Sequence, residues 1–457
     1  MIPQPLTEAL SALLGDRLAT AAIVREQHSR GEAHHAPHLP DAVVFPETVE
    51  EVQAVVRACA AHGVPITPFA IGSSLEGQAI PLRGGVSMDM NRMNRVLAVH
   101  AEDLDAVVQP GVTRVQLNEH LKGTGLFFSV DPGADASLGG MAATRASGTN
   151  AVRYGTMREN VLAMQVVLAD GRVIRTGTRA RKSSAGYDLT RLFVGSEGTL
   201  GIITELTVRL WGQPEAVTAA VCPFGDLGSA VNAVIATIQM GIPVARIELL
   251  DEAQLRGFNA YSGYAMAETP TLFLEFHGSE AGVAEQMETF RDIAEGFGAQ
   301  GFETATRAED RNRLWGARHK AYYSGLSLRP GSKGYVTDAC VPISRLAEAI
   351  LETKADIAAS NLLAPMVGHV GDGNFHMCIL IDPEDTAEKA EAERLAGRIA
   401  ERAIRLGGTC TGEHGVGTGK LAYMQAEHGD GWAVMRRIKQ ALDPEGVLNP
   451  GKVVGGN

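Results

Sequence analysis

The chain has 457 residues, more than one hydrophobic core usually serves, so its length predicts two or three domains. Hydrophobic residues make up 45% and charged residues 21%, which excludes a disordered chain. The net charge of −12 disfavours nucleic acid and anionic lipid as partners.

Short strands and few long helices predict an α+β domain in the first half of the chain. Residues 7–14 are expected to form a helix, and a loop rich in His and Pro follows. Thr48 with Glu51 three residues later predicts a capping box for the next helix, which ends near Cys59. Strands are expected at residues 43–45, 65–69, 86–90, 105–109, 162–168 and 201–211.

The second half alternates helices with strands. The expected helices are residues 224–240, 281–299, 345–360 and 386–406, and the expected strands are 245–250, 271–277, 335–341, 365–368 and 375–381. This order favours a ferredoxin-like sheet of mostly antiparallel strands covered by helices. A tail helix at 432–442 and a loop rich in Pro and Gly at 443–452 end the pattern.

The cellular setting is predicted from what the sequence lacks. The five cysteines are scattered and have no CxxC spacing, which indicates a reducing compartment. The N-terminus shows no basic and then apolar pattern of a secretory signal, and no run of about 18 apolar residues occurs. We expect a cytoplasmic protein, with peripheral attachment to a membrane left open.

Glycines gather in three loops between residues 68 and 201. The 52 glycines exceed the usual share of ~7%. The loops read PFAIGSSLEGQ from Pro68, DPGADASLGG from Asp131 and GSEGTLG from Gly195. In the first, backbone N–H groups with Gly72, Ser73 and Ser74 predict an anion nest for a pyrophosphate. Each loop alone is typical of an ordinary turn. Three together favour a long dinucleotide.

These loops, with the run up to VGSEGTLGIITELTVRL, resemble the FAD domain of the vanillyl-alcohol-oxidase/p-cresol-methylhydroxylase superfamily over residues 40–211. The ending LDPEGVLNPGKV also matches. The resemblance implies FAD, and Ser73, where some relatives attach FAD through a His, implies that it is not covalent. The implied cofactor-binding residues are Pro68, Ile71, Gly72, Ser73, Ser74, Leu75, Gln78, Pro132, Gly133, Asp135, Ser137, Gly139, Gly140, Thr144, Ser147, Gly148, Tyr154, Gly155, Glu197, Gly198, Gly201, Ile203 and Asn449.

The stretch GHVGDGNFH predicts a pair of adjacent histidines. Asp372-Gly373 is a two-residue hairpin signal, and centring the turn there places His369 opposite His376. Two imidazoles at one point suit a divalent metal. The later segment GTCTGEHGVG offers Glu413 and His414 as further groups, which point to opposite faces if the chain is extended. A structural pair of histidines remains the alternative. The following GVGTGK is excluded as a phosphate loop because Leu421 follows its lysine.

GHVGDGNFH and GTCTGEHGVG in this order resemble the cap region of the D-lactate, D-2-hydroxyglutarate and glycolate flavoprotein branch. The resemblance implies His369, His376 and Glu413 as metal ligands, with zinc preferred over manganese or iron, and His414 as the base that meets the substrate. It implies Asn374 as a further substrate contact. The expected fold is therefore a two-subdomain FAD-binding domain at 1–213, a cap domain with an antiparallel sheet covered by helices at 214–423, and a segment at 424–457 that returns to the FAD domain.

Substrate recognition is assigned to a helix expected over residues 313–323. Arg318 and Tyr322 are four residues apart and so share a face, and Arg318 is suited to hold a carboxylate. In the family, an Arg at this place meets the substrate carboxylate. The sequence departs from the pattern of relatives that act on 2-hydroxyglutarate at two positions, with Val336 in place of a Lys and Cys378 in place of an Asn. Both departures weaken the case for a dicarboxylate substrate and favour D-lactate.

The resulting hypothesis is metal-assisted oxidation of a small D-2-hydroxy acid on FAD, with glycolate or D-2-hydroxyglutarate as alternative substrates. Electrons are expected to pass to a separate acceptor, a cytochrome, a quinone or an electron-transfer flavoprotein, and a homodimer is compatible with the sequence. A metal hydrolase without flavin is the alternative from another class, but it leaves the three glycine loops unexplained. A nucleotide-binding protein without catalysis leaves Arg318 and His414 unexplained.

Overall fold

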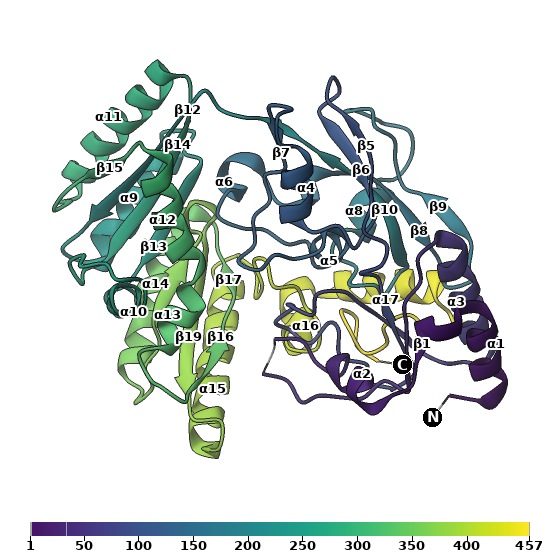
Figure 1. The fold of residues 1–457 in the computed structure, drawn as a ribbon. Helices are drawn as coiled ribbons and strands as arrows, with labels where there is room; N and C mark the ends of the chain where they lie inside the picture. Colours follow the sequence, from purple (N-terminus) through teal and green to yellow (C-terminus); the bar gives the residue numbers. More distant parts are fainter. Residues whose placement is uncertain (1, 33, 457) are drawn as a thin grey trace. The chain divides into compact units, whose positions relative to one another are not determined.

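The computed structural model describes residues 2–32 and 34–456, and the chain forms two compact units (Figure 1). Unit 1 comprises residues 1–147, 155–213 and 413–457, and unit 2 comprises residues 148–154 and 214–412. These units differ from the expected domains in two places. The chain returns to unit 1 at Glu413 rather than at residue 424, and residues 148–154 belong to the second unit rather than the first.

A small, largely parallel sheet forms the first part of unit 1. Its strand order is β1-β2-β4-β3, in which β2, β4 and β3 run parallel and β1 is antiparallel to β2. Helix α3 (Val49–Ala61) buries Val52, Val55, Val56 and Cys59 against this sheet. Helix α1 (Gln4–Leu14) buries Leu6, Leu10 and Leu14 in the same core. The strands are β1 (Leu18–Ala19), β2 (Ala42–Val44), β3 (Ile66–Phe69) and β4 (Val86–Asp89).

The expected capping box at the start of α3 is only half formed. The Thr48 hydroxyl accepts from the Glu51 N–H at 3.2 Å, as predicted. The Glu51 carboxylate instead accepts from the Glu47 N–H at 2.7 Å and from the Arg17 guanidinium.

An antiparallel five-stranded sheet forms the second part of unit 1, in the order β5-β6-β10-β8-β9. Its strands are β5 (Val96–His100), β6 (Asp105–Val108), β8 (Val161–Val167), β9 (Val173–Arg175) and β10 (Ile202–Arg209). A separate pair joins β7 (Leu126–Phe127) to β11 (Trp211–Gly212). The helices of unit 1 beyond α1 and α3 are α2 (Ala22–Gln27), α4 (Arg114–His120), α5 (Leu138–Thr144), α7 (Met157–Asn160), α8 (Leu189–Phe193), α16 (Met424–His428) and α17 (Asp430–Leu442).

Unit 2 is built on one antiparallel sheet in the order β15-β12-β14-β13-β18-β19-β16, with the short β17 also paired to β19. Its strands are β12 (Ala216–Pro223), β13 (Arg246–Leu250), β14 (Thr271–Gly278), β15 (Glu303–Ala305), β16 (Lys333–Val336), β17 (Ala339–Cys340), β18 (Met366–Gly368) and β19 (Asn374–Ile381). The structure confirms the predicted α+β class, with an antiparallel sheet covered by helices.

Helices cover both faces of this sheet. The larger core joins the sheet to α9 (Leu227–Gln239), α11 (Glu280–Gly296), α14 (Leu346–Ala358) and α15 (Thr386–Arg405). A smaller core on the alternate strand positions joins it to α10 (Glu252–Ser262) and α12 (Ala308–His319). The remaining helices are α6 (Ala151–Tyr154) and α13 (Ala321–Leu326). Because Ile247 and Leu249 lie in the larger core, Glu248 between them points to the smaller one.

Two expected elements of unit 2 are interrupted. The strand predicted at 335–341 breaks at Thr337 and Asp338, because the Thr337 hydroxyl accepts from the Met377 N–H at 3.0 Å and Asp338 accepts from Asn374 at 2.7 Å. The helix predicted at 313–323 ends at His319, and α13 begins at Ala321.

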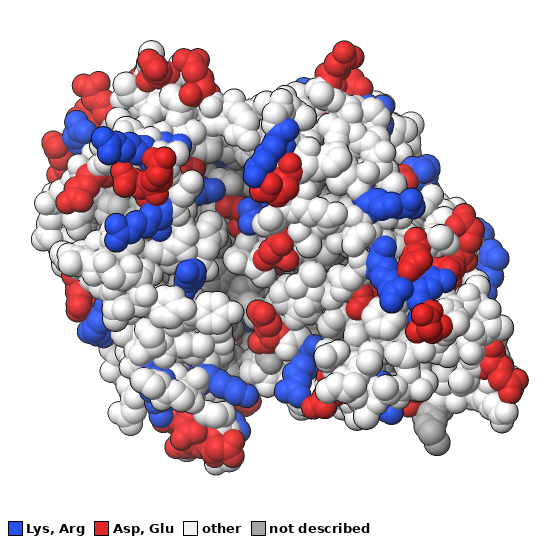
Figure 2. All heavy atoms as spheres, viewed as in Figure 1, with Lys and Arg blue, Asp and Glu red and all other residues white. Residues whose placement is uncertain are grey.

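The surface is mixed in charge, and acidic and basic side chains are interspersed over the face seen in Figure 2. Among residues 2–32 and 34–456, no helix combines the length and the apolar character needed to cross a membrane.

Candidate functional site

The three glycine-rich loops of unit 1 pack against one another. The first loop follows β3, the second leads into α5, and the third precedes β10. A Cβ added to Gly198 would lie 2.5 Å from Pro68, so the third loop touches the first. The Glu197 N–H donates to the Ala143 carbonyl at 2.9 Å, so the third loop also touches α5. These loops, which are far apart in the sequence, therefore meet in one region.

Asn449 ties the first and third loops together from the C-terminal segment. Its buried Nδ2 donates to the Gln78 carbonyl at 3.1 Å and to the Glu197 carbonyl at 2.7 Å. The Asn449 Oδ1, Ser74 Oγ and Ser196 Oγ atoms are buried with no hydrogen-bond partner among the described residues. Buried polar atoms are rarely left unpaired, so these atoms fit contact with a polar ligand such as FAD.

Two buried charges accompany the loops. The Glu197 carboxylate accepts from the Val416 N–H at 2.7 Å and the Gly417 N–H at 2.8 Å, yet burial raises its pKa to about 7. Burial also lowers the pKa of Lys452 to about 8, and its Nζ donates to the Ile80 carbonyl at 2.6 Å. Lys452 was not predicted from the sequence.

Three residues predicted to bind the cofactor are assigned to unit 2 or have other contacts within unit 1. Gly148 and Tyr154 belong to unit 2, where the Tyr154 hydroxyl is 2.6 Å from His277 Nδ1. Asp135 is exposed, and its carboxylate accepts from the Val115 N–H at 3.1 Å.

The histidine pair of unit 2 forms in a register that differs from the predicted one. Val367, not His369, lies opposite His376, and residues 370–372 form a 3-10 turn instead of a two-residue hairpin. Gly373 ends this turn at a φ of +78°, and a Cβ there would lie 2.1 Å from the Val341 carbonyl oxygen. This packing against Val341 favours the tighter 3-10 turn, and the predicted hairpin is wrong.

The two imidazoles still lie side by side. Their ring centroids are 5.4 Å apart, and a ring nitrogen of His369 lies within 4.8 Å of one of His376. His369 Nδ1 is 2.8 Å from Glu248 Oε1, and His376 Nδ1 is 3.1 Å from the Thr337 carbonyl. Metal-binding histidines commonly use their second nitrogen in such bonds, which fix the ring and its tautomer.

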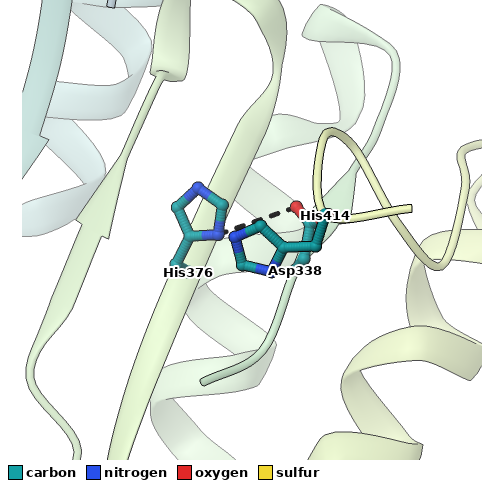
Figure 3. A group of neighbouring side chains, drawn as sticks. All are labelled: Asp338, His376 and His414. Atoms are coloured by element: carbon teal, nitrogen blue, oxygen red, sulfur yellow. Dashed lines mark ion pairs between the residues drawn. The ribbon is translucent and has the colours of Figure 1, made fainter. Parts of the chain in front are cut away.

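Asp338 supports His376 from the adjacent strand break. Its Oδ1 is 3.6 Å from His376 Nδ1, an ion pair drawn in Figure 3. The same carboxylate accepts from Asn374 Nδ2 at 2.7 Å and from the Thr411 hydroxyl at 2.8 Å. Asn374, predicted to contact the substrate, is therefore held within the histidine site.

Arg318 joins this site through Glu248. Its guanidinium donates to Glu248 Oε2, and both side chains are buried. Although burial by itself raises the pKa of Glu248, the charges of His369 and Arg318 outweigh it and the pKa is lowered. Arg318 and Tyr322 do not share one continuous helix, because α12 ends at His319 and α13 begins at Ala321; Tyr322 is 40% exposed.

Glu248 and Asp338 are the site residues that were not predicted from the sequence. Each is an acidic residue in a largely apolar run of the sequence, ARIELL for Glu248 and YVTDACV for Asp338. Acidic residues are seldom fully buried without a partner, so this pattern could have pointed to both.

Glu413 and His414 open the last segment of unit 1. Residues 412–414 form a bend, so the condition under which Glu413 and His414 were expected to point to opposite faces, an extended chain, is not met. Gly412, the last residue of unit 2, packs so closely on Asn374 that a Cβ would lie 2.2 Å from its Nδ2. The His414 carbonyl accepts from Gln78 Nε2 at 2.7 Å.

Two family models cover most of the chain. An FAD binding domain matches residues 40–177, and the C-terminal domain of FAD linked oxidases matches residues 213–453. The chain is 51% identical to a probable mitochondrial D-lactate dehydrogenase of Danio rerio, over 98% of this chain and 91% of the relative. It is 46% identical to the mitochondrial D-lactate dehydrogenase [cytochrome] of Arabidopsis thaliana, over 99% and 80%. The solved 4-ethylphenol oxidase of Gulosibacter chungangensis shares the fold, with a TM-score of 0.81 at 21% identity over 99% and 98%.

Proposed function

We propose, because this chain belongs to the family of FAD-linked oxidases, that it oxidises a small D-2-hydroxy acid, D-lactate by preference, to the 2-oxo acid. One observation carries the substrate class. Within unit 2, Glu248 joins His369, a proposed ligand of the metal, to the buried Arg318, so a metal ligand and a cation suited to a carboxylate share one partner.

The glycine loops and Asn449 would hold FAD. When bound, FAD supplies the acceptor for the hydride on substrate C2. The buried Ser74 hydroxyl and Asn449 carbonyl oxygen, which lack partners among the described residues, fit polar contacts to this group. Ser73 in the first loop offers no nucleophilic imidazole, which supports non-covalent binding.

His369, His376 and Glu413 would hold a divalent metal, zinc by preference. Two imidazoles and a carboxylate form a donor set suited to zinc, iron or manganese. Glu413 follows Gly412 directly, so its Cα lies about 3.8 Å from that of a residue packed on Asn374. A bound metal would supply a Lewis acid for the substrate hydroxyl.

Arg318 would bind the substrate carboxylate. Glu248 occupies one of its amino groups, while Nε is buried with no hydrogen-bond partner among the described residues. A guanidinium carries five N–H donors, so it can serve both carboxylates. Asn374 and Tyr322 are the further substrate contacts that we propose.

His414 would accept the proton of the substrate hydroxyl, and bound FAD would supply the hydride acceptor that oxidation of C2–OH to C2=O requires. The 2-oxo acid then departs, and a separate acceptor takes the two electrons. We favour a cytochrome, because the Arabidopsis relative carries that acceptor in its name.

An apolar wall favours a small substrate. Val336 pairs with Cys378 across β16 and β19, and Cys378 lies two residues beyond His376 on the same strand. Alternate residues of a strand share a face, so these side chains and His376 line one surface. This surface suits the methyl group of lactate better than a second carboxylate.

The test is anaerobic flavin reduction by D-lactate in the wild type and in His414→Ala. We expect His414→Ala to keep FAD and to lose bleaching, while a control at the exposed His62, His62→Ala, bleaches normally. Unimpaired bleaching in His414→Ala would remove this residue from the reaction. A panel with L-lactate, glycolate and D-2-hydroxyglutarate ranks the substrates. A colourless protein with stoichiometric metal would favour the hydrolase.

A further inference from the structure

The GVGTGK segment that begins at Gly415 wraps around Glu76 within unit 1. The Glu76 carbonyl accepts from the Thr418 N–H at 2.8 Å and from the Gly419 N–H at 3.3 Å. A Cβ at Gly417, whose φ is +47°, would lie 1.9 Å from this carbonyl oxygen, and one at Gly419 would lie 2.1 Å from Glu76 Oε2. Glycine at these two positions therefore lets the segment close over both the backbone and the carboxylate of Glu76.

Lys420 ends the segment and pairs with the same carboxylate. Its Nζ lies 3.5 Å from Glu76 Oε1, and the side chains are only 8% and 5% exposed. Burying two charges costs more free energy than packing two apolar side chains of similar size. A buried pair in a flavoprotein loop is therefore a candidate for a functional role.

The carboxylate that Lys420 holds also faces His414. Glu76 Oε1 lies 4.0 Å from His414 Nδ1. One side chain, Gln78, holds both backbones in place: its Oε1 accepts from the Glu76 N–H at 3.1 Å, and its Nε2 donates to the His414 carbonyl at 2.7 Å. These two hydrogen bonds tie the backbone of Glu76 to that of His414, the two residues whose side chains face each other.

We propose that Glu76, held by Lys420, is a positioning residue for His414. This inference rests on the proposed function, in which His414 takes the substrate proton. The carboxylate attracts the Nδ1 side of the imidazole, so the opposite nitrogen, Nε2, is turned toward the substrate. Carboxylates that orient a histidine base recur in enzymes, usually through a hydrogen bond; here the 4.0 Å separation makes the contact an ion pair.

The test compares Glu76→Gln with the wild type by stopped-flow flavin reduction with D-lactate. We expect the limiting rate to fall roughly 10- to 100-fold, because positioned acid–base groups contribute about 10²–10⁴-fold. The half-saturating concentration of D-lactate should change little, since Arg318 still binds the carboxylate. Dithionite should reduce the variant flavin completely. The control is Glu26→Gln, which removes a carboxylate from an exposed ion pair of the same unit and should leave the rate unchanged.

Glu76→Gln leaves Lys420 buried without its charge partner and can weaken folding. The double variant Glu76→Gln/Lys420→Met removes both charges and should show the same loss of limiting rate with FAD retained. A wild-type rate in either folded variant overturns the inference and leaves the proposed function standing. If none of the four hydroxy acids reduces the flavin of the wild type, the proposed function fails, and the positioning role fails with it.

Discussion

Replacing Glu248 by Gln tests whether one buried carboxylate organises the histidine site. The substitution keeps the size of the side chain and removes the charge that pairs with Arg318, while weakening the bond at 2.8 Å to His369 Nδ1. The side chains of Glu248 and Arg318 are only 1% and 7% exposed. Breaking a buried pair of this kind costs about 3–5 kcal/mol. We expect a loss near the lower end, because the amide still offers hydrogen bonds.

The free energy of unfolding in urea measures the loss of stability, and a zinc titration measures whether Glu248 also orients His369 at the proposed metal site. Loss of a carboxylate that is hydrogen-bonded to a metal-binding His typically lowers the metal affinity 10- to 100-fold. The matched control is Glu391→Gln, which removes a carboxylate from an exposed two-bond pair with Arg394 and should change neither quantity. A Glu248→Gln protein with unchanged unfolding free energy and unchanged zinc affinity would refute the reasoning.

Three further predictions concern single side chains. Gly373→Ala should destabilise the protein by about 3 kcal/mol in urea unfolding, because the residue has a φ of +78° and its Cβ would strike Val341. Glu51→Gln should lower the free energy of unfolding by about 1 kcal/mol at pH 7, since the bond to Arg17 lowers the Glu51 pKa below 4.5. The difference from the wild type should vanish as the pH falls through that lowered pKa. A difference that persists in acid would contradict this prediction. Val336→Lys should lower kcat/KM for D-lactate and raise it for D-2-hydroxyglutarate in the anaerobic panel, whereas an unchanged ratio would separate Val336 from substrate choice.

Much of the fold followed from local patterns. The apolar spacing of Val52, Val55, Val56 and Cys59 and the hydroxyl of Thr48 specified α3 because the signals lie within one helix. Strand β12 (Ala216–Pro223) was not predicted, although it pairs with both β14 and β15. A strand buried on both faces lacks the alternation of polar and apolar residues by which strands are recognised.

The candidate site was predicted where its residues are close in sequence. His369 and His376 lie seven positions apart, so a turn was enough to infer that they meet, even though the turn type was wrong. Arg318 was singled out, but its carboxylate partner lies 70 residues earlier on another strand. Local periodicity carries no information about which strand a helix packs on, so that pairing could not be inferred from the sequence.

Three carboxylates to which the sequence patterns assigned no role have the same surroundings. Glu248, Asp338 and Glu76 are all buried, and each lies within 4 Å of a histidine nitrogen. An isolated carboxylate is costly to bury, so an acidic residue in an apolar stretch implies a cation or several N–H donors nearby. Glu248 and Asp338 lie in such stretches and can be recognised in the amino-acid sequence alone, whereas Glu76 lies in a loop rich in Gly and Ser and cannot. The apolar stretch identifies the residue that needs a partner but not the partner itself, because a histidine, an arginine and a lysine all satisfy the same requirement.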